Sequence, residues 1–105
     1  LPLNQDSELT KAARSHAEDM LKRGYFSHYT PEGFSPFDRL ERFSISYIAA
    51  AENLAFAPET DLAFSGLMKS TGHRKNILDK NFRKVGIGVV DAGIYGKMFV
   101  QEFTD

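Results

Sequence analysis

The sequence predicts an α+β domain in which helices pack on a small antiparallel sheet. Apolar residues recur at helical spacing along the first part of the chain, most clearly over residues 7–23. The last third changes to strand-like segments at 85–90 and 97–103, joined by a turn through 91–93. Because the helices come first and a hairpin last, the order favours helices segregated onto a sheet over alternating βαβ units.

The first helix is the best-defined element. Asp6 can cap its start, Glu8 lies in its first turn, and Gly24 follows its last turn. His16 lies on the apolar stripe of this helix, and we interpret it as a core histidine, with a supporting contact to a functional site as the alternative. The apolar positions of the stripe are Leu9, Ala12, Ala13, Ala17, Met20 and Leu21.

The middle of the chain predicts shorter elements. A loop over residues 25–36 leads into a short helix at 36–43, which begins at Pro36. Residues 47–57 are ambiguous, and we interpret their second half as a strand leading out of Glu52. A third helix is capped by Thr60 and ended by Gly72, and a helical turn or tight loop follows at 76–78. Gly86 and Gly88 in one strand indicate that something bulky approaches that face.

Size and composition place limits on function. A chain of 105 residues is one domain, residues 1–105. The net charge of −1 does not indicate a nucleic-acid partner, and no apolar run approaches the ~20 residues of a membrane span. The chain has no cysteine, which excludes disulfides and thiolate chemistry. It begins at Leu1, so we expect that a leader or an N-terminal region has been removed.

Three residues are candidates for chemistry: His28, Glu52 and His73. Histidine and glutamate make proton-transfer pairs and open metal sites. Taken singly, each has an ordinary interpretation: His28 as a surface residue, Glu52 as an exposed or paired carboxylate, and His73 as a cation behind a helix end. The sequence has no His-Glu-x-x-His motif, no phosphate-binding glycine loop ahead of a helix and no nucleophile elbow.

The order of short segments resembles a known family. The segments are Leu9–Ala13, His16–Met20, Phe26–His28, Ser35–Arg39, Glu52–Ala55, Ser70–Leu78, Val85–Val89 and Gln101–Phe103. Together they resemble the CAP superfamily, or SCP domain, which includes cysteine-rich secretory proteins, insect-venom antigens and plant pathogenesis-related proteins. The chain is most similar to the compact bacterial branch.

The resemblance implies a three-layer α-β-α sandwich whose cleft holds His28, Glu52 and His73. It also implies zinc or another divalent ion bound through His28 and His73, no organic cofactor, and a location outside the cell or in the cell envelope. We expect supporting residues around the cleft at Arg39, Asn53, Ser70 and Asn76. Ser70 stands where many eukaryotic members carry a second glutamate, which leaves a triad unless Glu32, Glu41 or Glu59 reaches in.

Three functions remain open. The first is a secreted, non-enzymatic and monomeric module that binds a divalent metal and a small-molecule, lipid or peptide ligand. The second is a zinc-dependent hydrolase or protease with Glu52 as base. In the third, the triad is structural, and Glu52 holds the loops around His28 and His73 in place.

Overall fold

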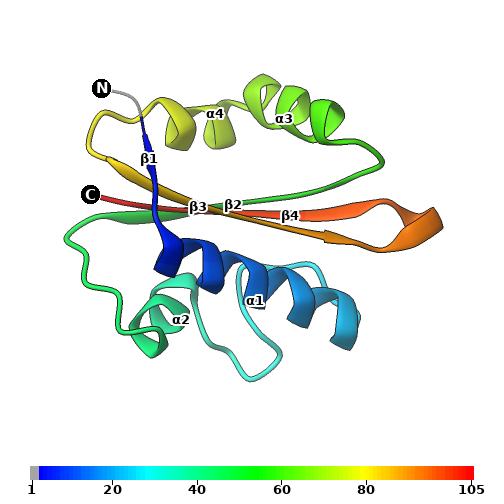
Figure 1. Cartoon of the computed structure of the whole chain (residues 1–105), viewed down its shortest axis with the longest axis horizontal. Helices are drawn as coiled ribbons and strands as arrows, with labels where there is room; N and C mark the ends of the chain where they lie inside the picture. The colour runs from blue at the N-terminus through cyan, green and yellow to red at the C-terminus, as the bar shows by residue number, and fades with distance from the viewer. Residues whose placement is uncertain (1–2) are drawn as a thin grey trace.

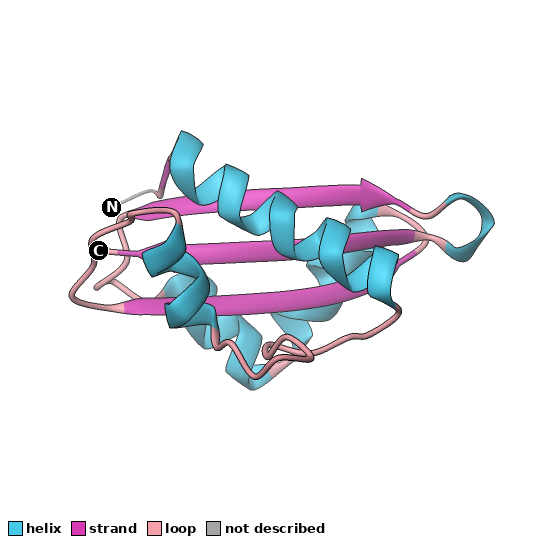
Figure 2. Ribbon diagram, turned by 90° about the horizontal axis from the view of Figure 1, so that it is seen from below, coloured by secondary structure: helices cyan, strands magenta, loops and turns pink. Residues whose placement is uncertain are grey.

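The computed structural model describes residues 3–105 as a three-layer α-β-α sandwich (Figure 1). Helices α1 and α2 cover one face of a four-stranded sheet, and α3 and α4 cover the other (Figures 1 and 2). The predicted fold class is therefore confirmed. In chain order the elements are β1 (Asn4–Gln5), α1 (Ser7–Arg23), α2 (Pro36–Arg42), β2 (Ala50–Ala57), α3 (Thr60–Lys69), α4 (Thr71–Leu78), β3 (Lys84–Asp91), a 3₁₀ turn (Gly93–Tyr95) and β4 (Lys97–Thr104).

The sheet has the strand order β1-β3-β4-β2, so β2 forms one edge. β4 pairs antiparallel with β3, as the predicted hairpin requires, and also antiparallel with β2, the strand that contains Glu52. The two-residue strand β1, which the sequence did not reveal, pairs parallel with β3. The sheet is therefore mixed, with an antiparallel centre and a short parallel edge.

Helix α1 begins and ends as predicted. The Asp6 carboxylate accepts a hydrogen bond from the backbone N–H of Leu9 at 3.0 Å. Gly24 takes a left-handed conformation at φ 71° and donates its N–H to the carbonyl of Met20. The buried side of the helix meets the even-numbered residues of β2 and β4, and this core contains Ala13, Ala17, Met20, Leu54, Met98 and Val100.

Gly86 and Gly88 lie directly beneath α1. A Cβ on Gly86 would stand 2.0 Å from the carbonyl carbon of Leu9, and one on Gly88 would stand 2.4 Å from the backbone nitrogen of Arg14. The bulky neighbour that the glycines predicted is therefore the backbone of α1 itself. This close approach sets how deep the helix lies on the sheet.

The predicted boundaries around His73 were wrong. Helix α3 ends at Lys69, because Ser70 is extended with φ −88° and ψ 122°. A new helix, α4, begins at Thr71, and Gly72 lies in its first turn. His73 is therefore inside the start of α4 and does not follow a helix end. Thr60 is likewise the first residue of α3, and Glu59 occupies the cap position without a side-chain cap bond.

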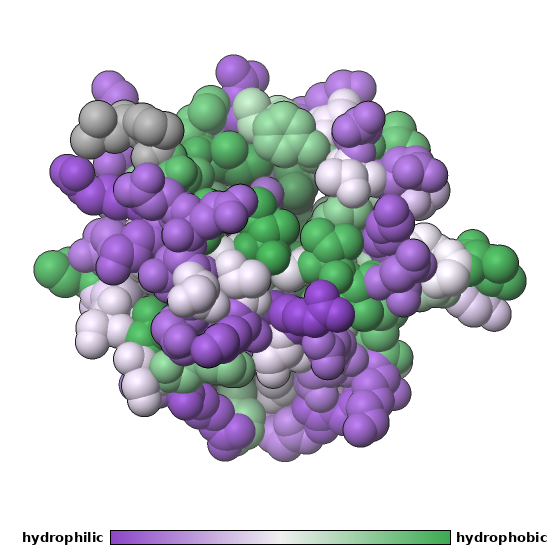
Figure 3. All heavy atoms as spheres, in the orientation of Figure 1, coloured by the Kyte–Doolittle hydropathy of each residue, from purple (hydrophilic) through white to green (hydrophobic). Residues whose placement is uncertain are grey.

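Polar residues cover much of the face shown in Figure 3, and the β3–β4 hairpin projects from it with an apolar tip. At that tip, Ile94 is 95% exposed and Tyr95 is 76% exposed. No helix within residues 3–105 combines the length and the apolar character needed to cross a membrane.

Candidate functional site: a buried Arg–Glu network ending at His28

The site is built around Glu52, which β2 points toward α1 and α2. Its side chain is 1% exposed. Nη2 of Arg39, from α2, lies 2.9 Å from Oε1 and 2.7 Å from Oε2 of Glu52. The same Nη2 donates to the backbone carbonyl of His28 at 2.7 Å, so one guanidinium joins the strand to the 25–35 loop. Arg39 and Glu52 were both predicted site residues, and the structure brings them together.

His28 is the solvent-facing end of this network. Its Nδ1 lies 2.7 Å from Oε1 of Glu52, and its side chain is 50% exposed. A carboxylate accepts hydrogen bonds, so Nδ1 carries the proton and Nε2 of the neutral ring keeps its lone pair. The arrangement therefore holds one imidazole at the surface in a defined orientation.

Glu102 is a fourth member that the sequence analysis did not select. It faces Glu52 across the β2–β4 pair, its side chain is fully buried, and its Oε2 lies 3.2 Å from Nη1 of Arg39. Burial, together with the hydrogen bond to Glu52 and its charge, raises the pKa of Glu102 well above its usual value. Burial acts in the same direction on Glu52. There, hydrogen bonds from Glu102 and His28 and the charge of Arg39 outweigh it and lower the pKa.

A single proton on Glu102 explains how the two buried carboxyl groups and Arg39 can lie together. Oε1 of Glu102 is buried without a hydrogen-bond partner, and Oε2 of Glu52 is buried with only the ion-pair contact to Nη2 of Arg39, which lacks hydrogen-bond geometry. A proton on Glu102 supplies the donor between the two carboxyl groups. It also leaves one guanidinium cation, Arg39, opposite one carboxylate, so no net charge is buried.

A signal for Glu102 was present in the sequence. In the segment 97–104, Met98, Val100, Glu102 and Thr104 alternate with the other face, so a carboxyl group stands in a row of core positions. The alternation alone does not identify the residue that lies opposite Glu102. Glu52 becomes the partner only through the strand register, which joins residues 50 apart in sequence.

The second predicted histidine belongs to another network, on the α3–α4 side of the sheet. Asn53 is fully buried, and its Nδ2 donates to the backbone carbonyl of His73 at 3.1 Å and to Gln101 at 3.0 Å. Nδ2 of Asn76 donates to Oδ1 of Asn53 at 2.8 Å. Nδ1 of His73 lies 2.9 Å from Oγ of Ser70. The expected supporting residues Asn53, Ser70 and Asn76 therefore all lie around His73.

The two networks lie on opposite faces of β2. Consecutive strand residues point to opposite faces, so Glu52 joins His28 on one side, and Asn53 joins His73 on the other. Within residues 3–105 no three His, Asp or Glu side chains come together as a metal-binding group. Nε2 of His28 and Nε2 of His73 are the ring nitrogens that neither network uses, whereas Arg39 and His28 already engage Glu52. Two imidazoles are fewer than the three protein ligands of catalytic zinc centres.

None of the three glutamates considered as a fourth acid joins the network. Glu32 pairs with Arg23, and Glu41 accepts a hydrogen bond from the hydroxyl of Tyr47 at 3.1 Å. Glu59 stands at the start of α3. The additional acid is Glu102, which comes from the sheet itself.

Known proteins share this fold and much of this sequence. The model of the CAP family, described as the cysteine-rich secretory protein family, matches residues 1–103. The chain belongs to the CAP family. It is 43% identical over 101 residues to the YkwD protein of Bacillus subtilis, covering 94% of this chain and 39% of YkwD. This CAP chain thus spans well under half of that relative's length.

Solved structures agree with the assignment. An extracellular protein containing an SCP domain from Bacillus anthracis superposes with a TM-score of 0.87 at 35% identity, covering 97% of this chain and 33% of that one. An outer surface protein of Borrelia burgdorferi superposes with a TM-score of 0.92 at 21% identity, covering 100% of this chain and 78% of that one. The second likeness concerns the fold alone.

Proposed function

We propose that this CAP domain is an exported, non-enzymatic binding module whose binding surface is formed around His28. The observation that carries the proposal is the 2.7 Å contact between Nδ1 of His28 and the buried carboxylate of Glu52. It leaves Nε2 of a fixed, half-exposed imidazole free to meet a metal ion or a hydrogen-bond donor. Export is supported by the similar Bacillus anthracis structure, which is described as an extracellular protein.

A divalent cation is the first ligand to test. A carboxylate that holds the other nitrogen of a ligating histidine is a common arrangement around metal ions, and it makes the imidazole more basic. Because β2 is an edge strand of the sheet, imidazoles from its two faces can meet around that edge, and in the proposed site Nε2 of His28 and Nε2 of His73 would hold the ion there, with water completing its coordination. A small polar, lipid or peptide ligand would then reach the ion or the imidazoles from solvent.

Zinc titration by calorimetry tests this proposal. We expect His28→Ala and His73→Ala each to remove most of the binding heat. Glu52→Gln is expected to weaken binding by about 10–100-fold through loss of the carboxylate behind His28. Tyr29→Ala is the matched control, because Tyr29 is an exposed neighbour of His28 and supplies no imidazole. Equal heats in wild type and the His28→Ala, His73→Ala double variant would refute the metal site.

The geometry favours binding over hydrolysis. A hydrolytic base must reach a water molecule and take its proton. Glu52 is buried, and its two oxygens lie against Arg39 and His28, so it has no free approach to solvent. Assays on casein and on cell-wall peptides, comparing wild type with Glu52→Gln, distinguish the two functions. Activity that is present in wild type and lost in the variant would favour the hydrolase.

A further inference from the structure

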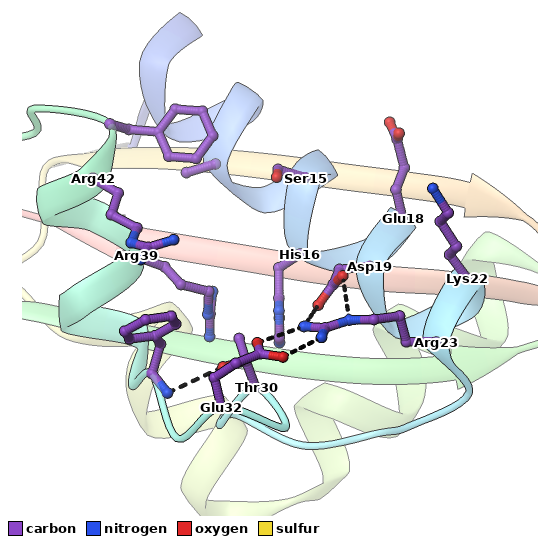
Figure 4. Close-up of a pocket in the computed structure, with 13 residues that line it drawn as sticks. Ser15, His16, Glu18, Asp19, Lys22, Arg23, Thr30, Glu32, Arg39 and Arg42 are labelled. Carbon is purple, nitrogen blue, oxygen red and sulfur yellow. Dashed lines mark hydrogen bonds and ion pairs between the residues drawn. The ribbon is translucent and has the colours of Figure 1, made fainter.

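Two side chains from different helices hold the backbone that carries His28. Nε2 of His16, from α1, lies 2.9 Å from the carbonyl oxygen of Ser27. Nη2 of Arg39, from α2, lies 2.7 Å from the carbonyl oxygen of His28 itself. Figure 4 shows both side chains extending from their helices in the same direction. Two consecutive carbonyl groups of the 25–35 loop are therefore each bonded to a different helix.

The ring of His16 makes its bond to the loop as a donor. A carbonyl oxygen can only accept, so Nε2 of His16 carries the proton. The residue is 2% exposed, and burial together with the nearby charge of Arg39 lowers the pKa of the ring. His16 is therefore a neutral imidazole that directs its one N–H to the residue before His28.

The other contacts of the loop do not replace this bond. The backbone N–H of Tyr29 donates to Oγ of Ser27 at 3.1 Å, which closes a local turn and does not attach it to a helix. Arg23 bonds Glu32 at 2.8 Å, and this ion pair fastens the loop to α1 at a later position. The hydrogen bond from His16 is therefore the contact with α1 that lies next to His28 in the chain.

The orientation of the His28 ring depends on the position of this backbone. Nδ1 of His28 lies 2.7 Å from Oε1 of Glu52, while half of the side chain is exposed. Glu52 is buried in the sheet, so the contact forms only if the loop holds His28 at the right distance from the strand. A hydrogen bond weakens once donor and acceptor separate beyond about 3.2 Å, so a small displacement of the loop is enough to break it.

We infer that His16 is a positioning residue for His28. By holding the carbonyl of Ser27, it keeps Nδ1 of His28 on Glu52 and leaves Nε2 of His28 available for a ligand. The effect on zinc rests on the proposed function, whereas the effect on the His28 ring rests on the contacts alone. Groups that orient a ligating imidazole from behind typically change metal affinity when they are removed.

His16→Gln and His16→Asn form a matched pair of neutral amides. The amide nitrogen of glutamine corresponds in position to Nε2 and can still donate to Ser27, whereas the shorter asparagine corresponds to Nδ1 and falls short of it. By calorimetry, we expect His16→Gln to bind zinc as wild type does and His16→Asn to bind about tenfold more weakly. His16→Phe keeps a buried ring without the N–H and should match His16→Asn, so the test does not depend on the folding of one variant.

A second readout uses the metal-free protein. Long-range ¹H–¹⁵N spectra at about pH 8 report which ring nitrogen of His28 carries the proton, and this is set by the hydrogen bond that the ring makes. We expect the Nδ1–H form in wild type and His16→Gln, and a mixture of both forms in His16→Asn and His16→Phe. Urea unfolding of the same variants measures stability separately, because a merely structural role would lower stability and leave the His28 ring unchanged.

The outcomes separate the two proposals. A wild-type ring form of His28 in His16→Asn or His16→Phe would overturn the inference, whatever the stability of the variant. Equal changes in His16→Gln and His16→Asn would also overturn it, because the donor would then not be the cause. If wild type binds no zinc, only the proposed function is refuted, since the ring form of His28 still decides the role of His16.

Discussion

Glu102→Gln tests the shared proton of the buried network. Glutamine keeps the shape of a protonated glutamate, because its amide N–H₂ can donate to Glu52 and its oxygen can accept from Arg39. In wild type, the folded-state pKa of Glu102 is raised above its unfolded value near 4.5. Between these two values the folded state binds more protons, so the stability contributed by this group is fully present below pH 4.5. It is lost as the pH rises toward the folded pKa.

The magnitude follows from this linkage. Each tenfold difference in proton affinity between the folded and unfolded states corresponds to about 1.4 kcal/mol. For a domain of this size, 1 kcal/mol changes Tm by about 4–8 °C. Glu102 is fully buried beside the ionised Glu52, and one guanidinium serves both groups. We therefore expect Glu102→Gln to match wild type near pH 4.5 and to exceed its Tm at pH 8 by about 6 °C or more.

The assay is thermal unfolding followed by circular dichroism between pH 4.5 and 8. The difference between variant and wild type is the informative quantity, because all other titratable groups are the same in both proteins and their contributions largely cancel. Glu59→Gln is the matched control, since Glu59 is exposed and its side chain makes no cap bond. A Tm difference that is constant with pH, or that grows as the pH falls, would refute the shared proton.

Three further substitutions test the fold and the second network by urea unfolding. Gly88→Ala places a Cβ against the α1 backbone and should destabilise by about 3 kcal/mol, whereas Gly66→Ala, with open space around it, should not destabilise. Asp6→Ala removes the α1 cap and should lower the free energy of unfolding by about 1 kcal/mol; an unchanged value would show that the cap contributes little. Asn53→Ala leaves the His73 carbonyl and Asn76 without their buried partner and should destabilise by about 1–3 kcal/mol. A neutral effect would mean that this network does not hold α4 on the sheet.

The predictions that succeeded rest on local chemistry. The limits of α1 follow from Asp6 and Gly24, whose cap and left-handed conformation involve residues a few positions away. The glycines of β3 predicted a close neighbour without identifying it. The predicted end of α3 was wrong because glycine commonly follows the last turn of a helix, and Gly72 therefore indicates such a position. The extended conformation at Ser70, which actually ends α3, has no comparable signal in the local sequence.

Grouping His28, Glu52 and His73 depended on the family resemblance, since each residue alone had an ordinary explanation. The structure shows His28 in contact with Glu52, and it places the bonds of His73 around Asn53 on the opposite face of β2. Side-chain alternation along a strand directs neighbouring positions to opposite faces of the sheet. The order of motifs in the sequence carries no information on that separation until the strand and its pairing are known.

By itself, the sequence determined the fold class, the limits of the main helix and the residue types available for chemistry, because helical periodicity, caps and composition are local properties. The tertiary structure alone decided that Glu102 opposes Glu52, that Arg39 lies between them and that His16 is buried with an unpaired Nδ1. These relations arise from strand register and from the packing of α1 and α2 on the sheet, which bring residues such as Arg39 and Glu102, 63 positions apart, into contact. The protonation and hydrogen-bonding capacity of each group depends on those distant neighbours.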